Sequence, residues 1–146
     1  MVRTNVDAII TMLSTALDAE LSREEDGSVL FGLDEDMGAM LHFSTGEEDG
    51  VLIASIVIGM PDSKDPLFYR DMLEANYMGT GTGGGVLSID AGTGLLVLFR
   101  EFVLPIDPAL FVDEFSYLVG SARDWNRRLA NESSSSPMLE DGMLRA

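Results

Sequence analysis

The sequence predicts a single α+β domain, with helices packed on an antiparallel sheet in the order α-β-β-β-α-β-β-α. The chain has 146 residues, which is the length of one domain, and 46% of them are hydrophobic, enough for a core. Two Asp-Pro pairs mark helix starts in its second half. The apolar runs between the helices are joined by short polar turns, which favours antiparallel neighbours.

The first expected helix runs from Thr4 to about Leu21. Thr4 with Asp7 three residues later resembles a capping box, in which each residue satisfies a backbone N–H of the other. The apolar residues that recur at helical spacing are Val6, Ile9, Ile10, Leu13, Leu17 and Leu21.

Three strands are expected next, at residues 28–33, 37–44 and 51–59. The third is rich in Val and Ile, as strands are. Acidic turns separate the strands, with Asp34-Glu35-Asp36 in the first and Glu47-Glu48-Asp49 in the second. We interpret both clusters as solvated turns, because neither has the ordered ligand series of a calcium loop.

The second half repeats the pattern of helix, strands and helix. Asp65-Pro66 begins a helix that runs to about Tyr77, and residues 86–90 and 95–103 are expected strands. The last helix begins at Asp107-Pro108 and carries a regular apolar stripe. The stripe consists of Phe111, Phe115, Leu118, Ala122, Trp125 and Leu129. We therefore expect one domain over residues 1–130 and a disordered serine-rich tail over 131–146.

The net charge of −16 limits the classes of partner. Phosphates would repel so acidic a chain, so we expect no nucleic-acid binding and no attraction to anionic membranes. No apolar run is long enough for membrane insertion, and there is no cysteine for disulfides or thiol catalysis. The charge has three interpretations: an ordinary soluble acidic protein, a protein kept soluble despite exposed apolar surface, or one steered towards a basic partner.

Residues 79–85, Gly-Thr-Gly-Thr-Gly-Gly-Gly, match the Gly-x-Gly-x-x-Gly dinucleotide fingerprint by letter. That fingerprint needs a strand before it and a helix after it, so that a helix N-terminus faces the pyrophosphate. Here a helix comes first and a strand follows. We interpret the loop as the end of the second helix, with Gly79 or Gly81 at positive φ.

Other candidate sites are equally weak. His42 is the only histidine, so zinc coordination is not expected, and we place it on a sheet face. No nucleophile motif is present, and Trp125 is expected in the core. We therefore predict no catalytic, cofactor-binding or metal-binding residues, and a protein-binding function.

From residue 67 onward the chain resembles the class I type III secretion chaperones of the Tir-chaperone (CesT-like) type. The matching features are a helix ending Leu-x-x-Asn, a Thr-Gly-Gly joint, a strand carrying an aspartate, an apolar strand ending Leu-Pro, and a last helix with spaced aromatics. They fall on Leu73-Glu74-Ala75-Asn76, Thr82-Gly83-Gly84, Val86-Leu87-Ser88-Ile89-Asp90, Gly94-Leu95-Leu96-Val97-Leu98 with Leu104-Pro105, and Phe111 to Trp125. The element order matches the family over about residues 4–130.

The resemblance implies a homodimeric chaperone in the bacterial cytoplasm, without ATPase activity. It would hold the N-terminal region of a secreted effector in extended form. By the same resemblance, effector grooves are expected at Ile10, Leu13, Leu17, Phe31, Leu33, Leu41 and Phe43. The dimer interface is expected at Leu67, Phe68, Met72, Leu73, Val97 and Phe99. Two alternatives are an interaction or regulatory domain of the same fold without a secretion role, and a nucleotide-dependent enzyme using the glycine loop.

Overall fold

The computed structural model describes residues 4–34, 36–44, 49–62 and 64–145, with side chains described as far as Asn131. It confirms the predicted order of helices and strands, and adds one short 3-10 turn. The elements are α1 (Asn5–Leu17), β1 (Val29–Asp34), β2 (Met37–Phe43), β3 (Val51–Gly59), α2 (Pro66–Asn76), η1 (Tyr77–Gly79), β4 (Val86–Ile89), β5 (Leu96–Val103) and α3 (Pro108–Arg145).

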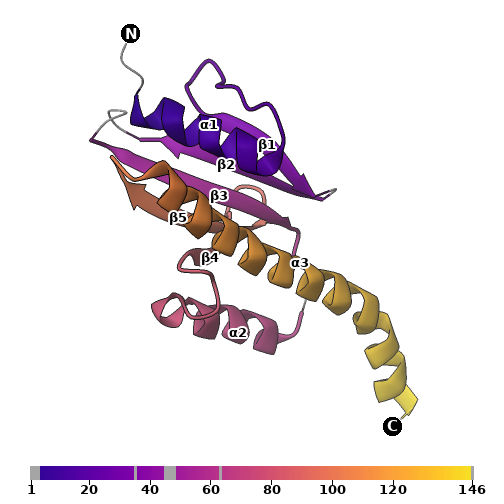
Figure 1. Ribbon diagram of the computed structural model, residues 1–146. Coiled ribbons are helices and arrows are strands. Elements are labelled where there is room, and N and C mark those ends of the chain that lie inside the picture. Colours follow the sequence, from indigo (N-terminus) through magenta and orange to yellow (C-terminus); the bar gives the residue numbers. More distant parts are fainter. Residues whose placement is uncertain (1–3, 35, 45–48, 63, 146) are drawn as a thin grey trace.

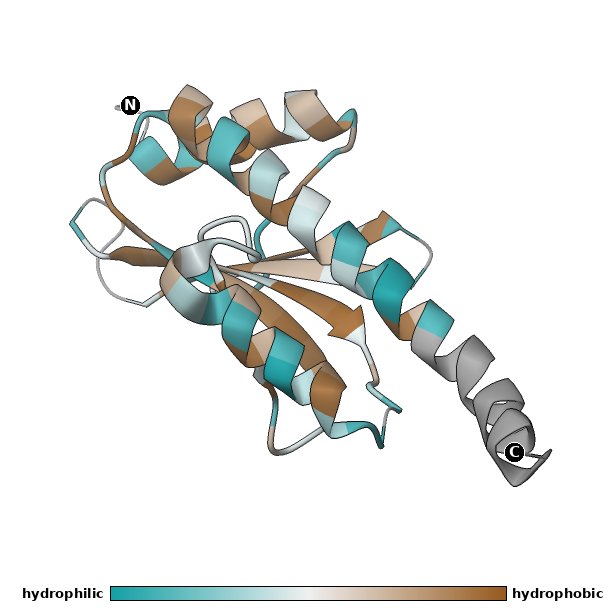
Figure 2. Cartoon of the chain, turned by 90° about the horizontal axis from the view of Figure 1, so that it is seen from below, coloured by the Kyte–Doolittle hydropathy of each residue, from teal (hydrophilic) through white to brown (hydrophobic). Residues whose placement is uncertain are grey.

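The five strands form one antiparallel sheet in the order β1-β2-β3-β5-β4. Helices α1 and α3 lie on the same side of this sheet, and α2 lies beside its β4 end (Figure 1). The strands are predominantly hydrophobic (Figure 2). Alternate residues of β3 are fully buried or half-buried, because successive side chains point to opposite faces. The fully buried face is the one that packs against the helices.

The three helices begin where the sequence predicts. Thr4 and Asp7 form the expected capping box, and Asp65 and Asp107 each accept a backbone N–H of the first helical turn at 3.0 Å. Helix α1 ends at Leu17 rather than at about Leu21, because the next residue, Asp18, has the left-handed conformation with φ of 50°. The early end frees the following segment to turn back towards β1.

Aromatic side chains of α3 form the centre of the core. Phe111 and Phe115 stack with ring centroids 5.7 Å apart. Trp125 is buried and meets Phe68 of α2 edge-on at 6.0 Å, as expected of a core residue. An ion pair between Arg128 and Asp71 adds to the contact. Helix α2 is therefore fixed to α3 by both apolar and polar contacts.

Two asparagine side chains join segments that are far apart in the sequence. The amide of Asn5 donates to the carbonyl of Ile106 and accepts its N–H, at 2.8 and 3.1 Å. Asn76 binds both backbone groups of Leu87 in the same way, at 3.0 and 2.7 Å. At Leu87, which lies in β4, this pair replaces the two backbone hydrogen bonds that a neighbouring strand would supply.

Helix α3 is assigned the bounds Pro108–Arg145. Residues 132–146 carry no described side chains. The division into a domain over 1–130 and a disordered tail over 131–146 therefore stays a prediction.

Candidate functional site: a groove beside the β1 edge

A groove of about 220 Å³, lined mostly by apolar residues together with Ser116 and Arg123, lies between α1, β1 and α3. Its apolar lining comes from all three elements: Leu13, Ala16, Leu17, Ala19 and Leu21 from α1 and the segment after it, Phe31 and Leu33 from β1, and Phe115 and Val119 from α3. Leu17 is 37% exposed, while Phe31 and Leu33 are half-buried. Its lining therefore leaves apolar surface within reach of a partner.

Local structure places each part of the groove. The rings of Phe31 and Phe115 meet at 6.0 Å, which sets β1 against α3. Before β1, the carboxylate of Asp26 accepts hydrogen bonds from the hydroxyl and backbone N–H of Ser28. These bonds lower the pKa of the Asp26 carboxyl below its ordinary value, because they favour its charged form. A defined turn thus leads into the strand that borders the groove.

The strand beside the groove is an edge strand. In the described part of the chain, β1 pairs with β2 alone. An edge strand presents backbone N–H and C=O groups to which another extended chain can bind. The opposite edge differs, because Asn76 binds the N–H and the C=O of Leu87 in the middle of β4. The edge next to the groove is therefore better suited to strand addition.

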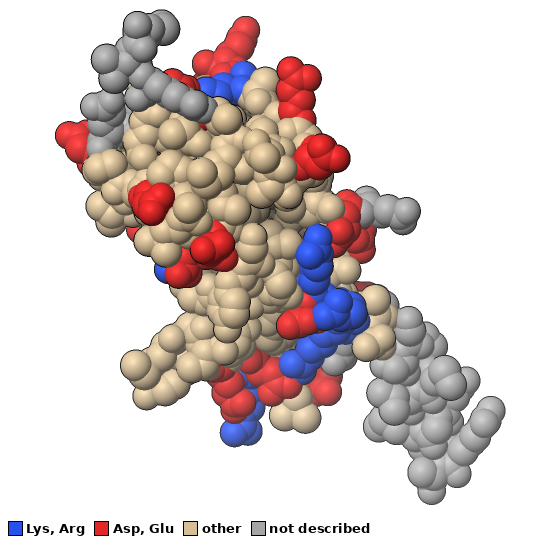
Figure 3. Space-filling model, viewed as in Figure 1, with Lys and Arg blue, Asp and Glu red and all other residues tan. Residues whose placement is uncertain are grey.

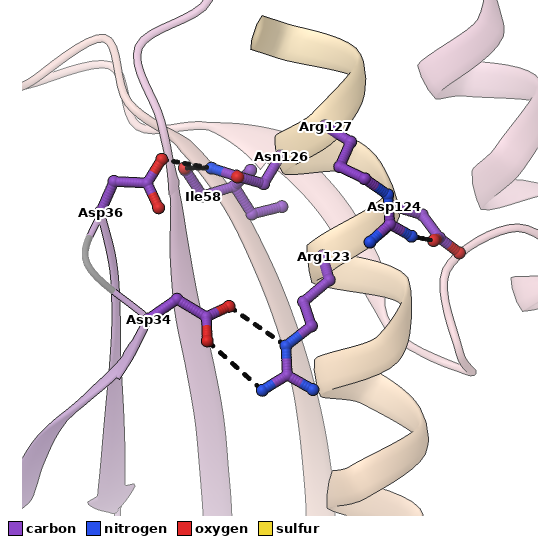
Figure 4. Close-up of polar contacts among 7 residues, drawn as sticks. All are labelled: Asp34, Asp36, Ile58, Arg123, Asp124, Asn126 and Arg127. Carbon is purple, nitrogen blue, oxygen red and sulfur yellow. Dashed lines mark hydrogen bonds and ion pairs between the residues drawn. The ribbon is translucent and has the colours of Figure 1, made fainter.

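Polar side chains tie the β1–β2 turn to α3 at one border of the groove. Arg123, which also lines the groove, binds both carboxylate oxygens of Asp34 at 3.1 and 3.4 Å. Asn126 donates to Asp36 and to the carbonyl of Ile58 (Figure 4). On the face shown in Figure 3, basic side chains gather over α3 with acidic ones beside them. Asp34 and Asp36 are exposed, as expected of a solvated turn, and each also binds an α3 side chain.

The structure brings together four of the seven residues predicted to bind an effector. Leu13, Leu17, Phe31 and Leu33 line the groove. Ile10 and Leu41 are buried in the core, so their side chains are enclosed by the domain itself. Phe43 is half-buried beneath the guanidinium of Arg23, 5.3 Å from its ring centroid. The effector-binding role of all seven residues stays a prediction.

Sequence reasoning missed the part of the groove that α3 contributes. Phe115, Ser116, Val119 and Arg123 line it, and only Phe115 belongs to the predicted apolar stripe. The spacing of the other three, one turn apart along the helix, was a usable signal for a second face of α3.

The residues predicted for the dimer interface fall into three groups by burial. Leu67 and Leu73 are 58% and 72% exposed on α2, whereas Phe68 and Met72 are buried under the same helix. Val97 and Phe99 are half-buried. They alternate with the buried Leu96 and Leu98, so they lie on the sheet face away from α1 and α3.

The glycine loop is packed inside the domain. A Cβ on Gly83 would come within 2.9 Å of the Ser121 hydroxyl and 3.0 Å of the Tyr117 carbonyl, both on α3. The Trp125 indole donates to the Gly81 carbonyl at 3.1 Å, and the buried Thr82 hydroxyl donates to the loop at 2.6 Å. Small residues are needed here because the backbone touches α3 directly.

Backbone N–H groups of this loop are already bound to carbonyls. The N–H groups of Thr80, Gly81, Gly84 and Gly85 donate to oxygens of the loop or of the helical segment before it. A phosphate would have to displace these bonds, which supports the interpretation of the loop as a joint. Gly79 has the expected positive φ of 71°, but Gly81 does not; Gly83 and Gly84 do, at 62° and 84°. Gly81 is required for space, since its Cβ would lie 2.8 Å from that of Ala75.

The remaining candidate residue from the sequence is the histidine of β2. His42 is exposed on β2 opposite Ile53. Within the described ranges, no group of three or more His, Cys, Asp or Glu side chains could hold a metal ion. Glu35, Glu47 and Glu48 of the acidic turns lie outside the described residues.

The fold and the groove define an α+β domain with an apolar groove beside a free strand edge. The sequence model of the Tir chaperone protein (CesT) family matches residues 8–126. The chain belongs to this family, which confirms the resemblance seen in the sequence.

Solved structures of other proteins share this fold. A chain of the ExsC–ExsE complex aligns with a TM-score of 0.69 and 19% identity, over 88% of this chain and 97% of that one. A chain of the HopA1–SchA chaperone–effector complex aligns with 0.67 and 16%, over 84% and 94%. A chain of the complex between the Yersinia pestis type III secretion chaperone SycH and a fragment of YscM2 gives 0.59 and 18%, over 80% and 96%.

The search among curated protein sequences gave no match. In the part of the chain that the structure describes, no helix combines the length and apolar character needed to cross a bilayer.

Proposed function

We propose that this protein is a type III secretion chaperone that binds an extended segment from the N-terminal region of a secreted effector along the β1 edge. The observation that carries the proposal is the groove of mostly apolar residues beside β1, a strand that pairs with β2 alone in the described part of the chain. Family membership and the chaperone–effector complexes among the structural neighbours support it. The protein would act in the bacterial cytoplasm, without ATP hydrolysis or any cofactor.

The groove suits an unfolded segment for two physical reasons. Backbone hydrogen bonds to β1 would add a strand to the sheet whatever the sequence of the segment. Alternate side chains of that strand would point towards the groove, where Leu17, Phe31 and Leu33 offer apolar contact. Binding in extended form would keep the segment unfolded and prevent its aggregation.

We further propose that the chaperone is a homodimer, joined through the exposed side of α2. This short helix and the turn after it expose several large apolar side chains that a soluble monomer would leave in water. They are Leu67, which is 58% exposed, and Leu73, Tyr77 and Met78, which are each at least 71% exposed. Met78 also holds the left-handed conformation with φ of 54°, which is costly for a non-glycine residue.

Replacing Leu17 with glutamine tests the groove. Leu17 lines the groove at the end of α1, and glutamine keeps helix propensity while replacing apolar contact with a polar amide. Losing about 1–2 kcal/mol of apolar burial should weaken effector binding about tenfold. Leu110→Gln, at a site on α3 that is 49% exposed and outside the groove lining, is the matched control.

The assay is the affinity for an effector encoded beside the chaperone gene, measured by calorimetry after co-expression has shown a complex. Equal affinity for the wild type and the Leu17→Gln variant would contradict the assignment of this groove. A comparable loss in the Leu110→Gln variant would also contradict it.

A further inference from the structure

The arginines of the described chain are largely neutralised by carboxylates of the same chain. Five ion pairs account for this: Arg70 with Glu74, Arg100 with Glu114, Arg123 with Asp34, Arg127 with Asp124, and Arg128 with Asp71. The net charge of −16 arises because the chain has more carboxylates than cations available to form such pairs. Most of the described cations that a partner meets on this surface are therefore already bound; Lys64 is exposed and belongs to none of these five pairs.

Beside the groove, too, the described residues include carboxylates without a cation to pair with them. The one charged residue in its lining is Arg123, whose guanidinium is bound by Asp34. A shallow pocket adjoins the groove and shares Ala19 and Leu21 with it, and its charged residues are Asp18 and Glu20. Both are exposed, and among the described residues neither forms an ion pair with a cation. On the side of the groove formed by the end of α1, the accessible charge is therefore negative, whereas on the α3 side Arg123 and Arg127 are each paired with a carboxylate.

We propose that the segment bound in this groove carries a lysine or arginine next to its apolar residues, placed to reach Asp18 and Glu20. The inference rests on the proposed function and adds the chemistry of the partner to it. Asp18 is the C-cap of α1 and Leu17 directly precedes it, so an apolar residue in the groove and a basic neighbour would be bound together. Complementary charge of this kind selects the partner and speeds its association.

Two synthetic peptides test this directly. Both have the same core of alternating leucine and serine; one is flanked by lysines and the other by glutamates. We expect the lysine-flanked peptide to bind about threefold to tenfold more tightly in fluorescence anisotropy, as two exposed ion pairs would allow. Raising the salt from 0.1 to 1 M should remove most of this preference, because the screening length falls from about 10 to about 3 Å.

A charge-matched pair of variants locates the effect. Asp18→Asn with Glu20→Gln should abolish the preference, and asparagine tolerates the left-handed conformation at residue 18. Asp62→Asn with Asp90→Asn removes the same charge at exposed sites outside the groove and should leave the preference unchanged. Equal binding of the two peptides to the wild type, or equal effects of the two double variants, would overturn the inference and leave the groove in place. Binding of neither peptide would contradict the groove itself, and the proposed function with it.

Discussion

Replacing Gly83 with alanine tests whether the glycine loop is a packed joint. The left-handed φ of 62° costs a residue with a Cβ about 1–2 kcal/mol. The new methyl group would also lie 2.9 Å from the Ser121 hydroxyl, 3.0 Å from the Tyr117 carbonyl and 3.1 Å from the Leu118 Cα. Two of these atoms belong to the α3 backbone, which cannot move aside as a flexible side chain can. Overpacking of this kind adds about 1–3 kcal/mol.

We therefore expect Gly83→Ala to lower the free energy of unfolding by about 2–5 kcal/mol. The assay is urea denaturation followed by circular dichroism at a fixed protein concentration, because self-association would make stability depend on concentration. Gly120→Ala is the control: it lies within α3, and apart from its chain neighbours and the adjacent backbone of that helix no atom lies within 4 Å of the new Cβ. It should raise stability by about 0.5–1 kcal/mol. A Gly83→Ala variant as stable as the wild type would refute the packing of the loop against α3.

Two further substitutions test the closed edge and the dimer. Asn76→Ala leaves the N–H and C=O of Leu87 without their side-chain partner and should cost about 1–3 kcal/mol in urea denaturation. Asn76→Asp retains an acceptor for the N–H and should lose less; equal stability of Asn76→Ala and the wild type would contradict the role of this side chain. Leu73→Lys should convert a dimer to a monomer in light scattering, with a folded far-UV spectrum, because this side chain is 72% exposed in the single chain. An unchanged dimer would exclude this face of α2 from the interface.

The sequence predicts the elements well because their signals are local. The Asp-Pro pairs identify the first residues of α2 and α3, Pro66 and Pro108, since they supply both the cap and a pre-set φ. The end of α1 was misplaced because Asp18, rather than a glycine, takes the left-handed conformation there. Nothing in the hydrophobic pattern distinguishes this aspartate from one that continues the helix.

The site was only partly predictable because it depends on contacts between distant residues. The sequence of β1 shows that Phe31 and Leu33 share one face of the strand, because side chains alternate between the two faces. It does not show that α3 lies beside that face. The predicted binding residue Leu41 is equally apolar, yet it faces the core, since a shift of one residue exchanges the two faces of a strand. The pairing of Asn76 with Leu87, which closes the opposite edge, joins residues on two different elements.

The central claim is that an effector adds a strand to β1, and amide hydrogen exchange of the free and effector-bound chaperone tests it most directly. The account predicts that binding slows exchange in β1 (Val29–Asp34), and that β4 (Val86–Ile89) exchanges at the same rate in both states. Slowed exchange in β4 with unchanged exchange in β1 would contradict it.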